Sequence, residues 1–365
     1  MAHLARPSRR EDFEIAIICA LQIESDAVEA LLDDEYEIDG FSYDKAPGDR
    51  NTYTTGRLGN HHVVLAYLPG MGKASSAAVA SNILTSFKRI NLALVVGICG
   101  GVPRAADQTE ILLGDVIVST SVVQIDFGRQ YPNQFIRKDA LEDTLGRVSP
   151  EIRSFLRKAS GYLGRKKLKE KTAICSSQLC QKDGFHKSEY PGAEKDRLYP
   201  PDYRHKHRNA KSCSKCWNQD DEVCETALNS SCTELGCDEG LLVRRDRIQK
   251  AKGIAPDGNP IMDKADVREA QKASIHFGRV ASGDGVMKSG RHRDEITTRE
   301  KVIAFEMESA GAWDYLPTVV IKSVCDYADS HKNKEWQEYA AATAAACTKA
   351  FLEERRSVDA PVLGK

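Results

Sequence analysis

Three carboxylates follow short apolar runs, at points where strand-like sequence gives way to a helix or a loop. They are Glu24, Glu308 and Asp326. The preceding runs cover residues 13–19, 302–305 and 318–324. Ligands of open α/β sheets bind at the carboxyl ends of strands, so these side chains are placed for acid–base chemistry. Taken singly, each is also an ordinary helix-start or turn residue, and a chemical role requires that all three converge.

The elements that must position these carboxylates alternate between strand and helix. Apolar periodicity predicts helices over residues 23–32, 73–87, 150–163 and 336–352, and further strands over residues 92–96, 115–119 and 275–282. Residues 51–58 and 61–68 alternate around Gly59-Asn60, which is typical of a hairpin. Strands that alternate with helices favour an α/β protein with a sheet covered on both faces.

The carboxylate segments, together with Pro69-Gly70-Met71-Gly72-Lys73 and Gly97-Ile98-Cys99-Gly100-Gly101, resemble the nucleoside phosphorylase and nucleosidase superfamily. The similarity is greatest to the methylthioadenosine/adenosylhomocysteine nucleosidase branch and to the fungal nucleoside phosphorylase domains of NLR-like proteins. It implies a three-layer αβα fold with a central mixed sheet. We expect one such domain over residues 11–355, with an irregular polar insertion over residues 176–271.

The resemblance implies cleavage of the bond between ribose and a purine, through a cationic sugar as in glycoside hydrolysis. Asp326 matches the family's acid, which protonates or hydrogen-bonds the departing base. Because an ordinary Asp has a pKa near ~3.9, we expect apolar burial to favour its protonated form. Glu308 matches the ribose anchor, and Glu24 matches the carboxylate that activates water. No cofactor is implied for catalysis.

Hydrolysis, phosphorolysis and binding without catalysis remain open. Bacterial phosphorylases of this superfamily place Arg and Ser or Thr where this chain has Val95 and Ile98, and apolar side chains there disfavour phosphate. We therefore favour a nucleosidase. The alternatives are a purine nucleoside phosphorylase and a nucleotide-sensing or effector module of a fungal NLR-like protein. Related enzymes also imply a homo-oligomer.

The remaining candidate residues would contact the substrate. By the resemblance, Met307 packs on the sugar, glycine turns bring backbone close to the ligand, and Asp329 orients the acid. Val286 stands where the bacterial nucleosidase stacks a Phe on adenine, so the identity of the base stays open. The candidate binding residues are Gly72, Gly100, Gly101, Val286, Met287, Met307, Glu308 and Asp329. Met307 and the glycines are equally compatible with core filling and tight turns. Arg291-His292-Arg293 is either a phosphate contact of a nucleotide or a polar loop.

The insertion carries cysteines at metal-ligand spacing. Cys213 and Cys216 form one pair, and Cys232 and Cys237 could supply the second pair around a structural zinc ion. The ligand set stays open, because Cys175, Cys180, Cys224, His205 and His207 are also nearby. Free surface thiols are the alternative to a bound metal. A bound zinc would organise a segment that is too polar to fold around a core of its own.

Composition excludes several classes of protein. The net charge of −1 over 365 residues provides no general attraction to nucleic acid or to an anionic membrane. No run approaches the ~20 apolar residues of a membrane span, and the basic start lacks a secretory cleavage pattern. We expect a cytoplasmic protein with reduced thiols, whose partner is a purine nucleoside or nucleotide.

Overall fold

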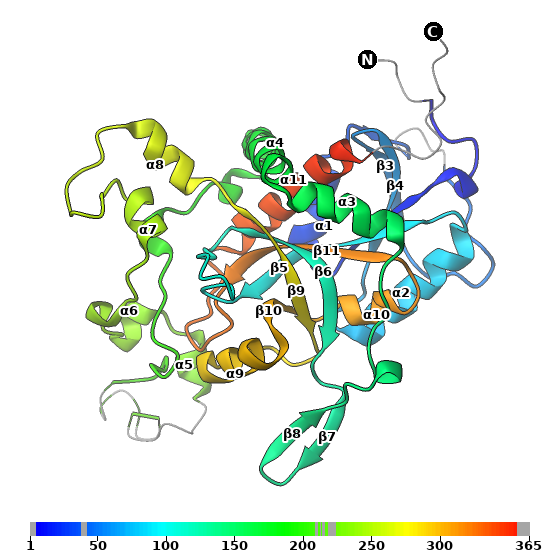
Figure 1. Ribbon diagram of the computed structural model, residues 1–365. Helices are drawn as coiled ribbons and strands as arrows, with labels where there is room; N and C mark the ends of the chain where they lie inside the picture. Colours follow the sequence, from blue (N-terminus) through cyan, green and yellow to red (C-terminus); the bar gives the residue numbers. More distant parts are fainter. Residues whose placement is uncertain are drawn as a thin grey trace.

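The computed structural model describes residues 5–37, 42–208, 211, 213, 216, 217 and 224–355. The chain forms a central mixed sheet between two layers of helices (Figure 1), which confirms the predicted three-layer αβα class. The strands of the main sheet are β1 Ile15–Cys19, β2 Asp34–Glu35, β3 Tyr53–Leu58, β4 His61–Tyr67, β5 Leu92–Gly101, β6 Val116–Gln124, β9 Ile275–Ser282, β10 Val302–Glu306 and β11 Thr318–Asp326. Their order is β10-β9-β6-β11-β5-β1-β4-β3-β2.

The sheet is closed at one end by its longest strand. Near its start β5 pairs in parallel with β1, and along its length it pairs in parallel with β11. Its last glycines, Gly100 and Gly101, pair instead with Phe305 and Ala304 of β10 in antiparallel fashion. This closure brings the carboxyl ends of β5, β10 and β11 together at one place.

Helices cover both faces of the sheet. On one face, α2 Lys73–Ser86 packs against α10 Ser309–Trp313. The other face carries α1 Gln22–Glu29, α3 Pro150–Ser160, α4 Tyr162–Cys180 and α11 Gln337–Glu354. The alanine-rich α11 lies against α4, α1 and β11, because its small side chains permit close approach. None of the described helices is both long enough and apolar enough to cross a bilayer.

Three elements differ from the sequence prediction. The helix predicted over residues 150–163 ends at Ser160, and a second helix, α4, runs from Tyr162 to Cys180 with Leu168 and Leu179 buried. The hairpin β7 Gly128–Tyr131 and β8 Gln134–Arg137 lies outside the main sheet. Residues 291–293 belong to α9 Gly290–Glu300, which Ser289 caps, and not to a loop.

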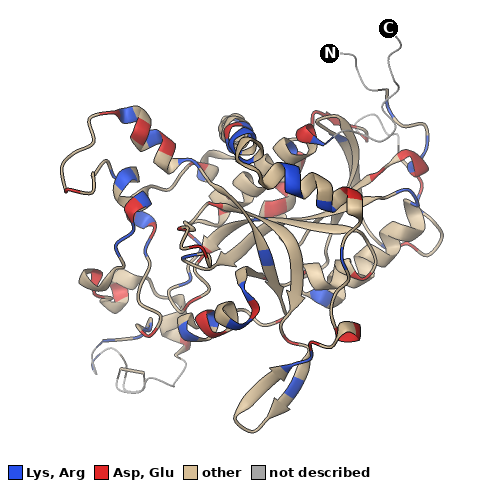
Figure 2. Ribbon diagram, viewed as in Figure 1, with Lys and Arg blue, Asp and Glu red and all other residues tan. Residues whose placement is uncertain are grey.

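The insertion lies beside the main body as connected short helices (Figure 1). In its described part these are α5 Glu225–Asn229, α6 Cys232–Leu235, α7 Asp246–Ala251 and α8 Lys264–Gln271. Figure 2 shows acidic and basic residues interspersed over these helices and over the outer helices of the main body, whereas most of the sheet is uncharged. A charge buried within the sheet is therefore an exception that calls for a physical reason.

Candidate functional site

A cavity of ≈ 340 Å³ opens at the place where β5, β10 and β11 end. The predicted residues that line it are Glu24, Gly100, Val286, Met287, Met307, Glu308 and Asp326. The structure therefore brings the three carboxylates to one cavity from three separate elements. Further lining side chains include Met71, Ile98, Ile125, Phe305, Glu306, Lys322, Lys332 and Lys334.

Glu24 sits in the first turn of α1 and is held almost entirely by backbone. Its Oε2 accepts hydrogen bonds from the N–H groups of Ala20 and Leu21, both at 2.9 Å, and its Oε1 accepts one from Ile98 at 2.8 Å. The side chain is 1% exposed. Burial raises the pKa of Glu24 above 4.5, although the nearby Lys322 opposes this shift. A fixed carboxylate with a raised pKa is suited to accept a proton from water near neutral pH.

Gly97 makes this position of Glu24 possible. It has a φ of +154°, and a Cβ atom at this residue would lie 1.9 Å from Oε1 of Glu24. No side chain fits that space, so glycine is required here by close approach as well as by backbone conformation.

Lys322 is a buried cation in the middle of β11, and its side chain is 3% exposed. Its Nζ lies 2.7 Å from Oε2 of Glu308. Burial opposes the charged form, but Glu308, Glu24 and Glu306 outweigh this effect and raise the pKa of Lys322. Lys322 thus compensates part of the charge of the buried carboxylates around it, since charged groups are tolerated in protein interiors when they are paired.

Glu306 and Glu308 have pKa values shifted in opposite directions, although they are only two residues apart. Glu306 accepts hydrogen bonds from the N–H groups of Glu308 and Ser309 at 3.0 and 2.9 Å and so caps the start of α10. Burial raises the pKa of Glu306. Burial alone would also raise the pKa of Glu308, but the ion pair with Lys322 prevails and lowers it. Glu308 is therefore the anion of the pair.

Asp326 ends β11. The sequence led us to expect only apolar neighbours around its carboxylate, but the structure places polar groups there. Its Oδ2 lies 2.8 Å from Nζ of Lys332 and accepts a hydrogen bond from the Cys325 thiol at 3.2 Å. Its Oδ1 accepts one from the N–H of Ala328 at 2.9 Å. The reason for the difference is the tight turn after β11, which carries Lys332 back over the carboxylate.

Three predicted residues do not line the cavity. Gly72 begins α2 with a φ of +108°. Gly101 lies against Val324, because a Cβ there would be 2.6 Å from a methyl group of that side chain. Asp329 accepts a hydrogen bond from the N–H of His331 at 2.9 Å and faces the insertion. A positive φ explains Gly72, close packing against Val324 explains Gly101, and a turn explains Asp329.

Sequence reasoning did not assign roles to Lys322, Glu306 or Lys332. The signal for Lys322 was present, since a lone lysine stands within the apolar run 318–324. Such a residue is almost never fully buried unless it is paired. Lys332 carried no comparable signal, because lysine is common in surface loops.

The Arg291-His292-Arg293 segment does not face the cavity. Arg293 is 2% exposed and donates to the carbonyl oxygen of Tyr327 at 2.8 Å. Arg291 pairs on the surface with Asp202 at 3.0 Å. These contacts make the segment part of the support behind the site, so it does not provide the phosphate contact considered from the sequence.

The four cysteines assigned to one metal site are divided between two places. Cys232 and Cys237 lie with His205 and His331, whereas Cys213 and Cys216 lie with His207 and Cys224. The reason is that each pair meets a different histidine, and His331 comes from the loop after β11, outside the insertion.

We predict that Gly97→Ala destabilises the protein by about 1–3 kcal/mol or more, because strained backbone and displacement of the Glu24 carboxylate both contribute. Gly48→Ala is the matched control, since Gly48 also has a positive φ of +89° but open space around it. Urea unfolding of both variants measures the difference. Equal losses would show that Glu24 does not need the space at Gly97.

We predict that Lys322→Met lowers the free energy of unfolding by about 3–5 kcal/mol at neutral pH, since it leaves buried carboxylates without their cation. The loss should shrink in acid. Glu308, whose pKa Lys322 lowers, stabilises wild type above its unfolded pKa, and that contribution disappears as pH falls through the folded pKa. Lys334→Met, at the exposed rim of the cavity, is the control. Urea unfolding at pH 7 and in acid measures both, and a pH-independent loss would contradict the charge argument.

Comparison with known proteins agrees with this arrangement. A family model described as the phosphorylase superfamily matches residues 14–211, more than half of the chain. A nucleotide-binding leucine-rich repeat (NLR)-like protein of Hyaloscypha variabilis is 28% identical over 354 residues. That alignment covers 95% of this chain and 30% of the relative, so this chain spans less than a third of the relative's length.

Solved structures share the fold at low sequence identity. The futalosine hydrolase of Helicobacter pylori is 16% identical, with a TM-score of 0.51, over 94% of this chain and 99% of that chain. A 5′-methylthioadenosine/S-adenosylhomocysteine nucleosidase from S. pneumoniae is 17% identical, with a TM-score of 0.50, over 93% and 99%. These structures show a shared fold, and the family match, which covers strands β1 to β8 and helices α1 to α4, establishes that the chain belongs to the phosphorylase superfamily.

Proposed function

We propose that this protein hydrolyses the N-glycosidic bond of purine nucleosides or nucleotides. The observation that carries the proposal is that Glu24, Glu308 and Asp326 face one cavity of ≈ 340 Å³. This volume falls in the lower part of the range of about 300–1,000 Å³ that is usual for small-molecule sites. Their three environments differ, and each environment suits a different step of the reaction.

The reaction develops positive charge on the sugar as the base departs. Glu308, kept anionic by Lys322, is suited to accept hydrogen bonds from the ribose hydroxyls and to stabilise that charge. Glu24, with its raised pKa, would take a proton from the attacking water. Asp326 would hydrogen-bond or protonate the leaving base, with the adjacent Lys332 ammonium as a further donor. Water thus adds to the sugar carbon as a hydroxyl group, and the bond to the base breaks with its electron pair passing to the base. The one proton that water gives to Glu24 is balanced by the one proton that the base takes up at the Asp326 side.

The geometry favours water over phosphate as the nucleophile. The N–H of Ile98, in the glycine segment where an anion would need donors, already donates to Glu24 at 2.8 Å. The carboxylate of Glu24 also fills the space beside Gly97. A phosphate dianion placed there would meet a second negative charge. Among the described lining residues there is no arginine to offset it.

Apolar side chains give the base its binding surface. Phe305, Ile125 and Met287 line the cavity, with the half-exposed Val286 at its edge. Lys332 and Lys334 also line it and would suit the phosphates of a nucleotide. The similarity to a much longer NLR-like protein supports the further proposal that this domain acts as one module of a larger protein.

The decisive assay follows free base from adenosine, guanosine and ATP, with and without inorganic phosphate. We expect release that does not depend on phosphate, because Glu24 directs water. Release only in the presence of phosphate would favour phosphorolysis. Measurable nucleotide binding with no release under either condition would support a sensor and would overturn the proposed hydrolysis.

Asp326→Asn tests the role of the acid. Positioned proton transfer contributes about 10²–10⁴-fold to rate, so we expect kcat to fall by that order while nucleoside binding persists. Asp314→Asn is the matched control, because Asp314 is an exposed carboxylate at the end of α10, away from the cavity. Unchanged turnover in Asp326→Asn would remove Asp326 from the mechanism.

A further inference from the structure

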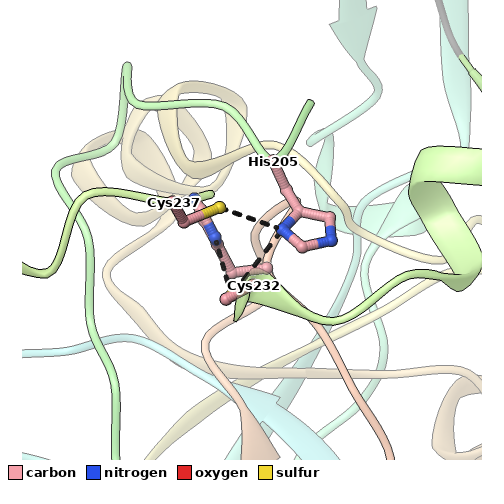
Figure 3. Close-up of side chains that lie close together, drawn as sticks. His205, Cys232 and Cys237 are labelled. Carbon is pink, nitrogen blue, oxygen red and sulfur yellow. Dashed lines mark hydrogen bonds between the residues drawn. The ribbon is translucent and has the colours of Figure 1, made fainter. Parts of the chain in front are cut away.

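Histidine and cysteine side chains gather in two groups beside the proposed site. The first group contains His205, Cys232, Cys237 and His331, and the second contains His207, Cys213, Cys216 and Cys224. Within each group the four candidate ligand atoms lie within 4.8 Å of one another. Figure 3 shows His205, Cys232 and Cys237 pointing toward a common centre. His205 and His207 are separated by one residue, so the two groups adjoin.

The spacing of the ligand atoms in the first group matches a tetrahedral zinc ion. Zinc bonds of ≈ 2.3 Å to sulfur and ≈ 2.0–2.1 Å to nitrogen place sulfur and nitrogen ligands about 3.5–3.6 Å apart in a tetrahedron. Nδ1 of His205 lies 3.7 Å from Sγ of Cys232 and 3.6 Å from Sγ of Cys237. Nδ1 of His331 lies 3.5 Å from Sγ of Cys232.

The second group has similar spacing. Nδ1 of His207 lies 3.3 Å from Sγ of Cys216 and 3.8 Å from Sγ of Cys224. The sulfur atoms of Cys213 and Cys224 are 4.0 Å apart. This separation is close to the about 3.8 Å expected for two thiolates on one zinc ion and far from the ≈ 2.05 Å of a disulfide.

The histidines of the first group are oriented for metal binding by their other ring nitrogens. Nε2 of His205 lies 2.8 Å from the carbonyl oxygen of Ser230, and Nε2 of His331 lies 2.8 Å from that of Tyr203. A carbonyl oxygen can only accept, so each Nε2 carries a proton, and Nδ1 is the ring nitrogen that faces the sulfurs and is available to a metal. Such a hydrogen bond to the second nitrogen is the usual support of a zinc-bound histidine.

The segment around these groups has little apolar material of its own. Its hydrophobic cluster consists of Tyr199, Ala227, Leu235 and Cys237, with partly buried neighbours. The ring of Tyr199 also stacks on that of His331, with their centroids 4.1 Å apart. So small a core does not hold a polar segment in one structure, and small segments of this kind commonly depend on a metal.

We propose that each group binds one zinc ion, and that the first ion fastens the insertion to the loop that follows Asp326. Two cysteines and two histidines in a tetrahedron, or three cysteines and one histidine, are both closed structural zinc sites. Thiolate and imidazole ligands also select zinc over calcium and magnesium. All four positions in each group are occupied by protein, so these ions stabilise structure and do not bind substrate.

The first site reaches the proposed catalytic loop through His331. Immediately before it, Ser330 accepts a hydrogen bond from the N–H of His205 at 3.0 Å. Immediately after it, Lys332 pairs with Asp326 at 2.8 Å. A metal bound by His331 would therefore limit movement of the backbone that positions Lys332 over Asp326.

Metal analysis of the purified full-length chain tests the proposal directly. We expect about two zinc ions per chain, one for each four-ligand group. Cys232→Ser and Cys224→Ser should each lower the content to about one zinc ion, and the double variant should have close to none. Cys180→Ser is the matched control, because Cys180 lies on α4 outside both groups and donates to the carbonyl oxygen of Ser188. Its zinc content should equal that of wild type.

Measurements on wild type keep the test independent of variant folding. Cobalt reconstitution should produce the strong visible absorption of a tetrahedral thiolate site, and thiol titration should show that the five grouped cysteines react only after a chelator is added. A wild-type chain that purifies without zinc, stays metal-free in zinc-containing buffer and has freely reactive thiols would overturn the proposal. Iron in place of zinc would overturn the identity of the metal.

Hydrogen exchange tests the proposed link to the loop without any activity measurement. Cys232→Ser should raise exchange at residues 327–334, since it removes the ion held by His331, whereas Cys224→Ser should leave that loop close to wild type. Equal exchange in both variants would overturn the link while leaving the metal sites in place.

Discussion

The end of the sheet that forms the cavity depends on one buried cation. Lys322 occupies the middle of β11, between β5 and β6, and is buried at the inner end of the cavity. It can stay there only because Glu308, Glu24 and Glu306 come close from separate elements. A single ammonium group cannot neutralise three carboxylates, so burial still raises the pKa of Glu24 and Glu306. Only Glu308, in direct contact, is kept as an anion. One shared cation thus produces carboxylates with different proton affinities within one cavity, and this is what stepwise proton transfer requires.

Local pattern was sufficient to predict most of the scaffold. The strand β9 has the predicted bounds Ile275–Ser282. Its end could be predicted because the glycine-rich sequence Gly283-Asp284-Gly285 follows directly. The hairpin of β3 and β4 was predicted from its turn residues for the same reason. The pairing of β10 with β5 could not be predicted, since it joins residues about 200 positions apart and arises from the twist of the whole sheet. The extent of helix α4 to Cys180 was not predicted, because charged and polar residues dominate the sequence beyond residue 163.

The site was predicted where its signals were local. Glu24, Glu308 and Asp326 could be found because each follows an apolar run, but the environment of Asp326 could not, since Lys332 reaches it by a turn. The cysteines likewise show that sequence spacing does not identify contacts between distant parts of the chain. A spacing such as that of Cys213 and Cys216 indicates a pair of ligands but not their partners, which here include a histidine and a third cysteine.

The insertion is part of the site's support in spite of its polar composition. Asp196 and Arg245, both in this segment, form a buried ion pair at 2.7 Å with side chains 1% and 2% exposed. The hydroxyl of Tyr327, the residue after Asp326, donates to Asp196 at 2.8 Å. A buried ion pair contributes little net stability compared with apolar packing, but it requires a specific geometry and is costly to break. The backbone of Asp326 is therefore fixed from the cavity side by the sheet and from the opposite side by the insertion. A segment that composition alone marks as peripheral consequently helps to determine where the acid of the proposed reaction lies.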